Sequence, residues 1–245
     1  MSRALIILLV GVFTMTAVAV EIDEKPIRAG LARMLPKAPT DSFKVRPTPV
    51  PGLVEVEIDS TVFYMTADGK HVLSGDLLDT EKRTNLTDVR RQAISVGVLN
   101  GMSEKNMIVM GPKDAKRTIT VFTDVDCGYC RRLQTQDVPE LTKQGVKVRY
   151  LLYPRTAPGT ESYNRSIAVW CAPNRIKAVE EGMAGKSIAM KTCPNPIADI
   201  HALGEKLAVS GTPAIFFDDG QRLPGYVPAD EMLSMLGMKQ SGVAR

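Results

Sequence analysis

The stretch VFTDVDCGYCRRL, residues 121–133, decides the fold predicted for this chain. An apolar, β-prone run over residues 118–122 leads into a turn that carries Cys127 and Cys130, and a helix-compatible run follows from Arg131. This arrangement places the first sulfur at a helix N-terminus, where unpaired amides and the positive end of the dipole favour a thiolate. Cys-x-x-Cys motifs lower the cysteine pKa below its free value of about 8.5. We therefore predict redox chemistry, with Cys127 as an exposed nucleophile and Cys130 as the resolving residue.

Two other uses of the motif have to be weighed. A structural zinc site needs four ligands, and the remaining candidates, Cys171, Cys193, His71 and His201, form no second Cys-x-x-Cys or His-x-x-x-His. A structural disulfide within the motif is the other alternative, but so short a ring is strained and tends to be labile. The strand before the motif and the helix after it favour the redox interpretation and predict no metal.

Length and composition set broad limits. A chain of 245 residues with 44% hydrophobic and 24% charged residues can form one large domain or two smaller ones. The net charge of +4 is mild and no block of Lys or Arg occurs, so we expect no binding to nucleic acid.

The N-terminus has the pattern of a secretory signal peptide over residues 1–19. Arg3 precedes an uncharged apolar run over residues 4–18, and an A-x-A site predicts cleavage after Ala19. An uncleaved anchor is the alternative, but the run is short for about 30 Å of hydrocarbon. We expect an exported protein that is not inserted in the membrane after cleavage and in which disulfides persist.

Residues 20–86 are predicted to form a small antiparallel-sheet domain. A short amphipathic helix is expected over residues 21–35, and prolines prevent its continuation. Strands are expected over residues 53–58 and 61–65, then after an Asp-Gly turn over 71–73, with a fourth from segments 76–78 and 84–86. Its edges could pair with a second copy, so we expect a homodimerisation domain.

A linker helix is expected over residues 87–105, with Thr87 as its N-cap and its end near Gly101. The catalytic domain then covers residues 106–245. Its strands are predicted over residues 107–110, 118–123, 146–152 and 214–217 with a return strand over 221–223, and its helices over 161–182, 197–209 and 228–236. The prediction is an α+β chain whose C-terminal domain is thioredoxin-like, with a helical insertion over about residues 155–209.

Gly211-Thr212-Pro213 stands directly before the strand over residues 214–217. In thioredoxin-like folds the loop at this place carries a cis-proline against the active-site disulfide. It would leave the Thr212 backbone free to bind an extended peptide by strand addition. A trans-proline that opens a strand is the alternative for the tripeptide alone, but together with the Cys-x-x-Cys motif we expect the cis form.

The two remaining cysteines, Cys171 and Cys193, are expected to pair in a buried structural disulfide. Cys171 follows the only tryptophan, Trp170, and Cys193 lies beside a proline turn. A second redox pair is the alternative, but neither residue has a helix-terminus environment.

The whole chain after the leader resembles the DsbC family of periplasmic disulfide isomerases. The motifs that carry the resemblance are Asp68-Gly69-Lys70-His71, the segment 121–130 with CGYC, residues 148–151, residues 184–187, residues 210–214 and Pro224-Gly225-Tyr226. The related DsbG proteins look closer to CPYC.

The resemblance implies a V-shaped homodimer whose N-terminal sheets pair and whose catalytic domains face a cleft for misfolded, disulfide-containing clients. It implies no cofactor, and a DsbD-like membrane protein as reductant. Cys127 would attack a non-native disulfide, Cys130 would offer the escape route, and Cys171–Cys193 would be structural. The expected substrate-binding residues are Gly128, Tyr129, Thr212 and Pro213. The alternatives are a holdase chaperone and an oxidoreductase of the DsbA or DsbG kind.

Two departures from the pattern matter. Arg131 and Arg132 follow the motif where family members often have a histidine first, and we expect these cations to favour the Cys127 thiolate further. Val121 occupies the place, six residues before Cys127, where thioredoxins carry a buried acid. Its loss removes a proton acceptor for Cys130 and argues against a pure reductase.

Overall fold

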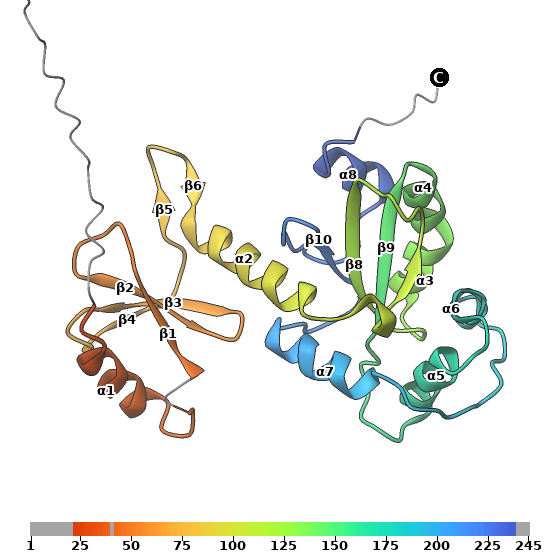
Figure 1. Cartoon of the computed structure of the whole chain (residues 1–245), viewed down its shortest axis with the longest axis horizontal. Helices are drawn as coiled ribbons and strands as arrows, with labels where there is room; N and C mark the ends of the chain where they lie inside the picture. The colour runs from red at the N-terminus through yellow and green to blue at the C-terminus, as the bar shows by residue number, and fades with distance from the viewer. Residues whose placement is uncertain (1–21, 40–41, 239–245) are drawn as a thin grey trace, which may run out of the picture.

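The computed structural model describes residues 22–39 and 42–238 of the chain. It consists of two parts joined by a long helix, α2 (Leu86–Asn100), and the predicted α+β class is confirmed (Figure 1). The predicted signal peptide lies outside the described residues. Over the described ranges, no helix is long and apolar enough to cross a membrane.

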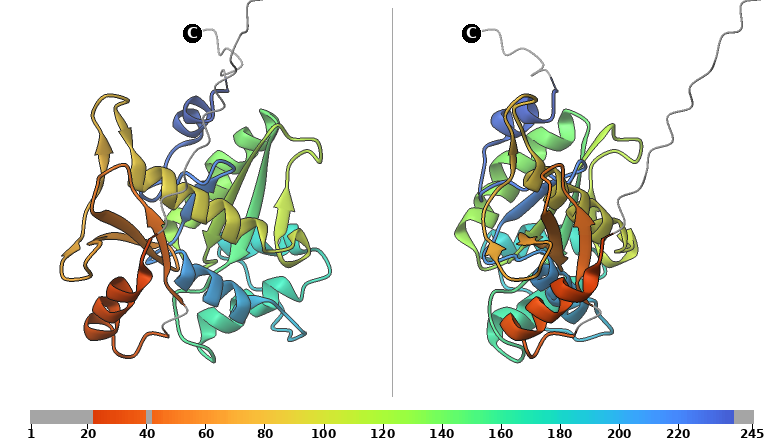
Figure 2. Two further views of the ribbon diagram at one scale, coloured as in Figure 1. Left: turned by 60° about the vertical axis from the view of Figure 1, so that its left-hand side comes forward. Right: turned by 90° about the vertical axis from the view of Figure 1, so that its left-hand side faces the viewer.

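The N-terminal part is an antiparallel sheet packed on helix α1 (Glu24–Met34). The strand order is β1 (Lys44–Pro47), β2 (Leu53–Ile58), β3 (Thr61–Thr66) and β4 (Val72–Leu73). Asp23 caps α1 by accepting the amide of Lys25, and Ile27 and Leu31 are fully buried in a cluster with side chains of β2 and β3. Figure 2 shows α1 lying across one side of this sheet. The helix and the first three predicted strands are therefore present close to their expected bounds.

The predicted fourth strand is wrong. Residues 78–79 and 84–85 form a separate two-stranded hairpin, β5 (Leu78–Asp79) with β6 (Thr84–Asn85), while β1 supplies the fourth strand. We did not predict β1, because the prolines around it indicated only that helix was excluded. β1 also explains how Glu57 can be buried: Lys44 and Arg46 of β1 form ion pairs with its carboxylate.

The linker helix α2 begins one residue earlier than predicted, and its N-cap is Asn85 rather than Thr87. The Asn85 side chain accepts the amide of Asp88, whereas Thr87 is fully buried. The Thr87 hydroxyl bonds the Tyr64 hydroxyl at 2.5 Å and accepts the Leu77 amide at 2.8 Å. Thr87 thus ties α2 to the N-terminal sheet instead of capping the helix. The helix ends at Asn100, and the expected remainder of the linker includes a separate 3-10 turn, η2 (Glu104–Asn106).

The other end of α2 is attached to the C-terminal part. Leu99 joins a core cluster that contains Phe122, Leu151 and Phe216. Gly220, in a turn with φ +86°, lies so close to α2 that an added Cβ would be 2.1 Å from the carbonyl oxygen of Gln92. Only glycine fits such an approach.

The C-terminal part is built on a four-stranded sheet of order β10 (Ala214–Phe217), β8 (Arg117–Thr123), β9 (Val146–Leu152), β7 (Ile108–Met110). β8 and β9 are parallel, and the two outer strands run antiparallel to their neighbours. The crossover between β8 and β9 consists of α3 (Gly128–Arg132), a π-helical turn η3 (Leu133–Asp137) and α4 (Val138–Lys143). The expected return strand over residues 221–223 is reduced to a single bridge between Phe216 and Arg222.

The predicted continuous helix over residues 161–182 is wrong, because it is divided into α5 (Glu161–Trp170) and α6 (Arg175–Met183). Pro173 in the break has no amide to continue a helix, and the Asn174 side chain caps α6 by accepting the Lys177 amide. Helix α7 (Ile197–Lys206) ends before the predicted Val209, since Ala208 has φ +50°. The last described helix is α8 (Ala229–Met235), one residue inside its predicted bounds at each end.

Candidate active site

The Cys-x-x-Cys motif lies where β8 passes into α3. Cys127 is the N-cap of α3, with extended backbone angles, and its carbonyl accepts the amide of Arg131 at 3.0 Å. Cys130 lies in the first turn of the helix. Both are free cysteines, and both are buried, with 4% of Cys127 and none of Cys130 exposed. The expectation of an exposed nucleophile is therefore wrong for the residue as a whole.

A buried carboxylate shapes the turn before the motif. Asp124 is 1% exposed, and its Oδ1 accepts the Asp126 amide at 2.9 Å. Its Oδ2 accepts both the amide and the Nε of Arg155, at 3.1 and 2.9 Å. Arg155 follows the end of β9, which runs parallel to β8, so the sheet topology brings it beneath the motif. We did not identify Arg155 from sequence, although the parallel pairing of these strands was the available signal.

The loop before β10 lies against the first cysteine. The Thr212–Pro213 peptide bond is cis, and when Cys127 is protonated its thiol donates to the Thr212 carbonyl oxygen at 3.2 Å. A groove of about 460 Å³ borders the loop, lined by Thr212, Pro213, Arg222 and their neighbours in residues 210–214 and 222–225. Cys127 does not itself line the groove, but Thr212, whose carbonyl contacts the Cys127 sulfur, does.

The two sulfurs have opposite proton affinities. The pKa of Cys127 is lowered to about 5, chiefly because the Cys130 thiol donates a hydrogen bond to it; the Thr212 side chain and the amides of Cys130 and Tyr129 add to the effect, against desolvation. The pKa of Cys130 is raised, because its thiol is the donor to Cys127 and because it is buried. At neutral pH the arrangement therefore gives one thiolate and one thiol.

The two arginines after the motif do not contribute to this thiolate in the way we expected. The interactions that lower the Cys127 pKa are hydrogen bonds, with neither arginine among them. The Arg132 guanidinium lies 4.8 Å from the ring centre of Tyr226, and its Nε donates to Gln136. Arg155 is a cation that does interact with the sulfurs. Its pKa is raised mainly by the hydrogen bond to Asp124 and, in smaller part, by the charges of Cys127 and Cys130.

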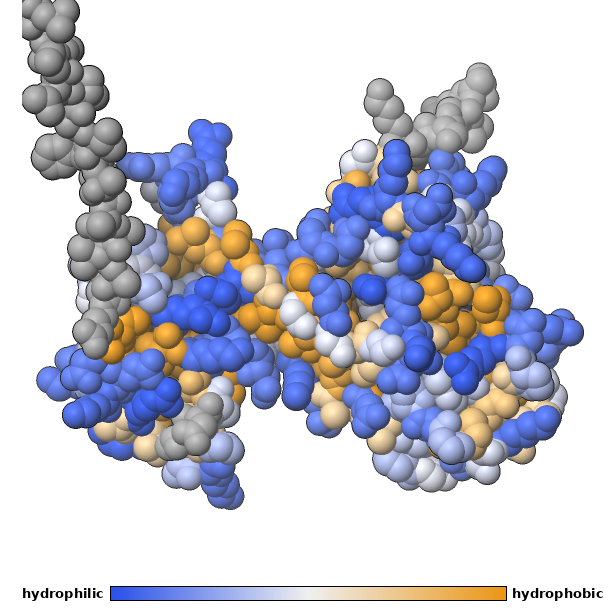
Figure 3. Space-filling model, in the orientation of Figure 1, coloured by the Kyte–Doolittle hydropathy of each residue, from blue (hydrophilic) through white to orange (hydrophobic). Residues whose placement is uncertain are grey.

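Two of the expected substrate-binding residues lie at the surface of the motif. Gly128 is exposed, and nothing lies within 4 Å of where its Cβ would be. The Tyr129 side chain is 61% exposed, and its ring centre is 5.9 Å from that of Tyr226. Together with the Thr212–Pro213 loop these residues border one approach to Cys127. In the space-filling view, hydrophobic residues lie in patches between hydrophilic ones on the visible face of the C-terminal part (Figure 3).

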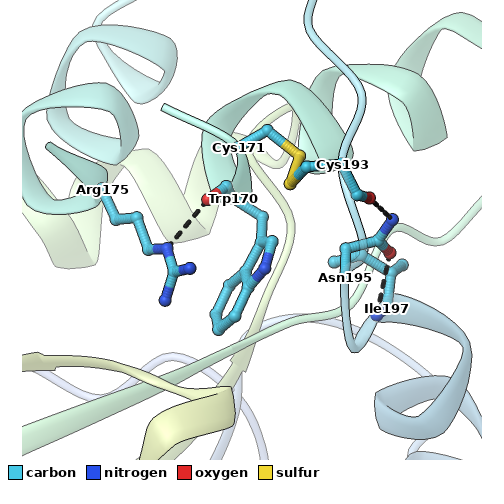
Figure 4. Close-up of a disulfide and its surroundings, with 6 residues drawn as sticks. All are labelled: Trp170, Cys171, Arg175, Cys193, Asn195 and Ile197. Atoms are coloured by element: carbon cyan, nitrogen blue, oxygen red, sulfur yellow. Dashed lines mark hydrogen bonds between the residues drawn. A yellow bond between two sulfur atoms is a disulfide. The ribbon is translucent and has the colours of Figure 1, made fainter. Parts of the chain in front are cut away.

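Cys171 and Cys193 form a disulfide with a Cα–Cα distance of 5.7 Å (Figure 4). Contrary to the expectation of a buried bond, both residues are half-buried and pack at the margin of the core. Arg175 lies over the Trp170 ring, 3.6 Å from its centre, and donates to the Trp170 carbonyl at 2.8 Å. Asn195 donates to the Cys193 carbonyl at 2.9 Å. The bond thus joins the end of α5 to the segment that leads into α7.

A metal centre finds no support in the described ranges, 22–39 and 42–238, where His, Cys, Asp and Glu side chains form no group of three or more able to hold an ion. His201 instead stacks on Tyr153, with ring centres 4.4 Å apart.

Comparison with known proteins identifies two family matches. Residues 104–239 match a model described as a thioredoxin-like domain, and residues 18–88 match one described as the N-terminal domain of disulfide bond isomerase proteins. The chain is 38% identical over 220 residues to the thiol:disulfide interchange protein DsbC of Escherichia coli (strain K12), which covers 90% of each chain.

The DsbC protein of Salmonella typhimurium is 37% identical over 233 residues, covering 95% of this chain and 94% of that protein. Among solved structures, a disulfide interchange protein from Neisseria gonorrhoeae is 29% identical, with a TM-score of 0.45, and covers 56% of this chain and all of that one.

Proposed function

The chain belongs to the DsbC family of thiol:disulfide interchange proteins, and we propose that it isomerises non-native disulfides of exported proteins through a mixed disulfide on Cys127. The observation that carries the proposal is the opposed pair of pKa values at the start of α3. A cysteine with a pKa of about 5 is a thiolate at neutral pH, while its neighbour stays protonated until it is needed.

The proposed isomerisation involves no net oxidation or reduction, unless Cys130 releases a stalled client. The Cys127 thiolate attacks one sulfur of a client disulfide, forming a mixed disulfide and releasing the other sulfur as a client thiolate. When a client thiolate then attacks the mixed disulfide, a new client disulfide forms and Cys127 leaves as a thiolate, with no net oxidation. If the client stalls, Cys130 attacks the Cys127 sulfur. The client leaves reduced, and the Cys127–Cys130 disulfide needs two electrons from an external dithiol, for which we propose a DsbD-like membrane reductant.

The client would bind beside the thiolate in extended form. Cis-Pro213 follows Thr212, and a strand laid along this loop could pair with the Thr212 backbone. Gly128 and Tyr129 would border the bound chain on the other side. We propose Cys171–Cys193 as a structural bond with no part in exchange, since it lies outside this groove.

We further propose that the protein is a periplasmic homodimer. Residues 20–86 would form the dimerisation domain, residues 87–105 the linker, and residues 106–245 the catalytic domain. The two edges of the N-terminal sheet support this division of roles. β1 carries Lys44, Arg46 and Pro47, which discourage pairing, whereas Val72 and Leu73 of β4 are 40% and 50% exposed. A second copy covering β4 would bury these side chains. We also propose a chaperone activity, in which a cleft between the two copies would hold misfolded clients.

Refolding of scrambled ribonuclease tests the proposal. The full chain after residue 19 is compared with a fragment over residues 103–245, which keeps η2 and the sheet strand β7. Reduction of a small disulfide serves as the control for folding. We expect the fragment to reduce the small disulfide but to isomerise poorly, and the full chain to do both. Equal isomerisation by a monomeric fragment would overturn the role of the N-terminal domain, and failure of the full chain would overturn isomerisation itself.

A further inference from the structure

The two arginines that follow the redox motif lack partners of opposite charge. Arg131 and Arg132 are exposed on α3, and within the described ranges neither forms an ion pair. The hydrogen bonds that lower the Cys127 pKa come from other groups. The charges of these two arginines are therefore available to a molecule that approaches the motif.

Helical spacing places Arg131 near the nucleophile. Arg131 follows Cys127 by four residues, and its amide donates to the Cys127 carbonyl at 3.0 Å. Side chains at this spacing lie on one face of a helix, with Cβ atoms about 5–6 Å apart, and they lean toward its N-terminus. The Arg131 guanidinium also lies near Gly185, where an added Cβ would be 3.9 Å from its Nη2. Arg131 is thus held between the motif and the loop that follows α6.

Arg132 is fixed beside an aromatic pair. Its guanidinium carbon is 4.8 Å from the ring centre of Tyr226, and its Nε donates to the side chain of Gln136 at 3.1 Å. The ring centre of Tyr226 is in turn 5.9 Å from that of Tyr129. Stacking on an aromatic ring leaves the planar fork of a guanidinium suited to bidentate binding of a carboxylate. Tyr226 and Gln136 thus hold a cation in place without neutralising it.

Tyr226 also connects Arg132 to the groove beside the cis-proline. Pro224, two residues before Tyr226, lines this groove together with Thr212. The Thr212 carbonyl contacts the Cys127 sulfur at 3.2 Å. An extended chain advances about 3.3 Å per residue. The side chains within reach of the arginines are therefore those one or two positions from a client cysteine that is joined to Cys127.

The acidic side chains around this face do not neutralise the two arginines. Asp124 and Asp126, in the turn before the motif, each pair with another arginine at 2.9 Å. Asp137 is buried, and its Oδ1 accepts an amide of α8 at 2.8 Å. Asp230 and Glu231 are exposed in the first turn of α8 and form no ion pair with a described residue.

We propose that Arg131 and Arg132 select client segments that carry carboxylate side chains next to the disulfide cysteine. The inference rests on the proposed attack of Cys127 on client disulfides. A client carboxylate one or two residues from its cysteine pairs with the fork of Arg132 or with Arg131. This pairing offsets the repulsion between the Cys127 thiolate and an acidic client, and it raises the rate of encounter.

Capped peptides of the pattern X-Ala-Cys-Ala-X test this preference, with Glu, Gln or Lys as X and the cysteine held as a pyridyl disulfide. The Cys127 thiolate attacks the peptide sulfur and forms the mixed disulfide. The pyridinethiolate leaves and takes up a proton to become an uncharged chromophore. With the reduced chain after residue 19, we expect the Glu peptide to react about fivefold faster than the Gln peptide, and the Lys peptide to be the slowest. The difference should shrink as salt is added.

Charge variants show whether the two arginines cause the preference. Arg131→Gln with Arg132→Gln should lower the ratio of the Glu to the Gln rate to about one. Arg131→Glu with Arg132→Glu should make the Lys peptide the fastest, which a loss of folding would not do. The matched control is Lys82→Gln with Arg83→Gln, which removes two exposed cations between β5 and β6 in the N-terminal part. It should keep the ratio of the unaltered protein.

The outcomes separate this selection from the proposed function. Equal rates for the three peptides, or a ratio that persists without the two arginines, would overturn the selection. An equal fall of the ratio in the Lys82 and Arg83 control would overturn it too, because net charge would then be the cause. Absence of chromophore release from all three peptides would instead overturn Cys127 as the nucleophile, and with it the proposed function.

Discussion

The two cysteine pairs of this chain belong to one domain and border the same core, yet they differ in nearly every property that governs reactivity. Cys127 and Cys130 are three residues apart, more buried and unbonded, and they share a proton at a helix N-terminus. Cys171 and Cys193 are 22 residues apart, partly exposed and joined. The reactivity of a cysteine in this chain therefore follows from the hydrogen bonds that stabilise its thiolate and not from its exposure to solvent.

Removal of the nucleophile is the strongest test of this contrast. Cys127→Ala should abolish both isomerisation and reduction, because no other described cysteine has a lowered pKa. Cys130→Ser should instead trap the mixed disulfide with a client, which mass spectrometry of the non-reduced protein would detect. Residual turnover in Cys127→Ala, absent from a double variant with Cys130→Ala, would mean that the two roles are interchangeable.

The other pair should affect stability rather than chemistry. The double variant Cys171→Ala with Cys193→Ala should lose about 3 kcal/mol of unfolding free energy, the chain-entropy value for a closed loop of this size. Urea unfolding measures the loss. Under conditions where the variant is folded, the rate of Cys127 alkylation should be unchanged. A slower alkylation in the folded variant would show that the two pairs are coupled and would remove the contrast.

The pH dependence of alkylation sharpens the comparison. With a pKa of about 5 for Cys127, the thiolate dominates above that pH, so the rate should be nearly constant near neutrality. Below pH 5 the thiol dominates, and the rate should fall about tenfold per unit. A rate that keeps rising up to about pH 8.5, as for a free cysteine, would show that the environment does not activate Cys127.

The smallest expected effect comes from a single hydroxyl. Thr212→Val keeps the shape of the side chain but removes a group that lowers the Cys127 pKa. The contact of Cys127 with the Thr212 carbonyl is kept in this variant, and the Thr212 hydroxyl has no hydrogen-bond partner among the described residues, so we expect the pKa to rise by about half a unit or less. The same alkylation profile measures this shift. Thr160→Val, which removes the cap of α5 far from the motif, is the matched control.

Local signals in the sequence predicted most of the architecture. The strand-turn-helix pattern around residues 121–133 and the alternation over residues 53–58 identified the elements that the structure contains. The errors arose where a tertiary contact overrides a local preference. The sequence predicts Thr87 as an N-cap, but its hydroxyl forms hydrogen bonds with the Tyr64 hydroxyl and the Leu77 amide instead. β1 is held by pairing with β2 and by the ion pairs to Glu57, which no local pattern reveals.

The site was predictable in its chemistry but not in its supporting groups. Cys127, Cys130, Thr212 and Pro213 were identified by motif and order along the chain. Arg155 was not, because it reaches the turn before the motif from beyond the end of β9, and the register of that strand against β8 is not specified by the sequence.

The contact of Gly220 with Gln92 has a consequence for protein engineering. Helix α2 and the catalytic domain meet there backbone to backbone, without an intervening side chain, and Leu99 packs the same helix into the core of that domain seven residues later. The C-terminal half of α2 is therefore fixed on the catalytic domain and does not act as a flexible linker. Exchange of the N-terminal domain for another dimerising unit would preserve the reach of the catalytic site only if the graft point lies before Gln92.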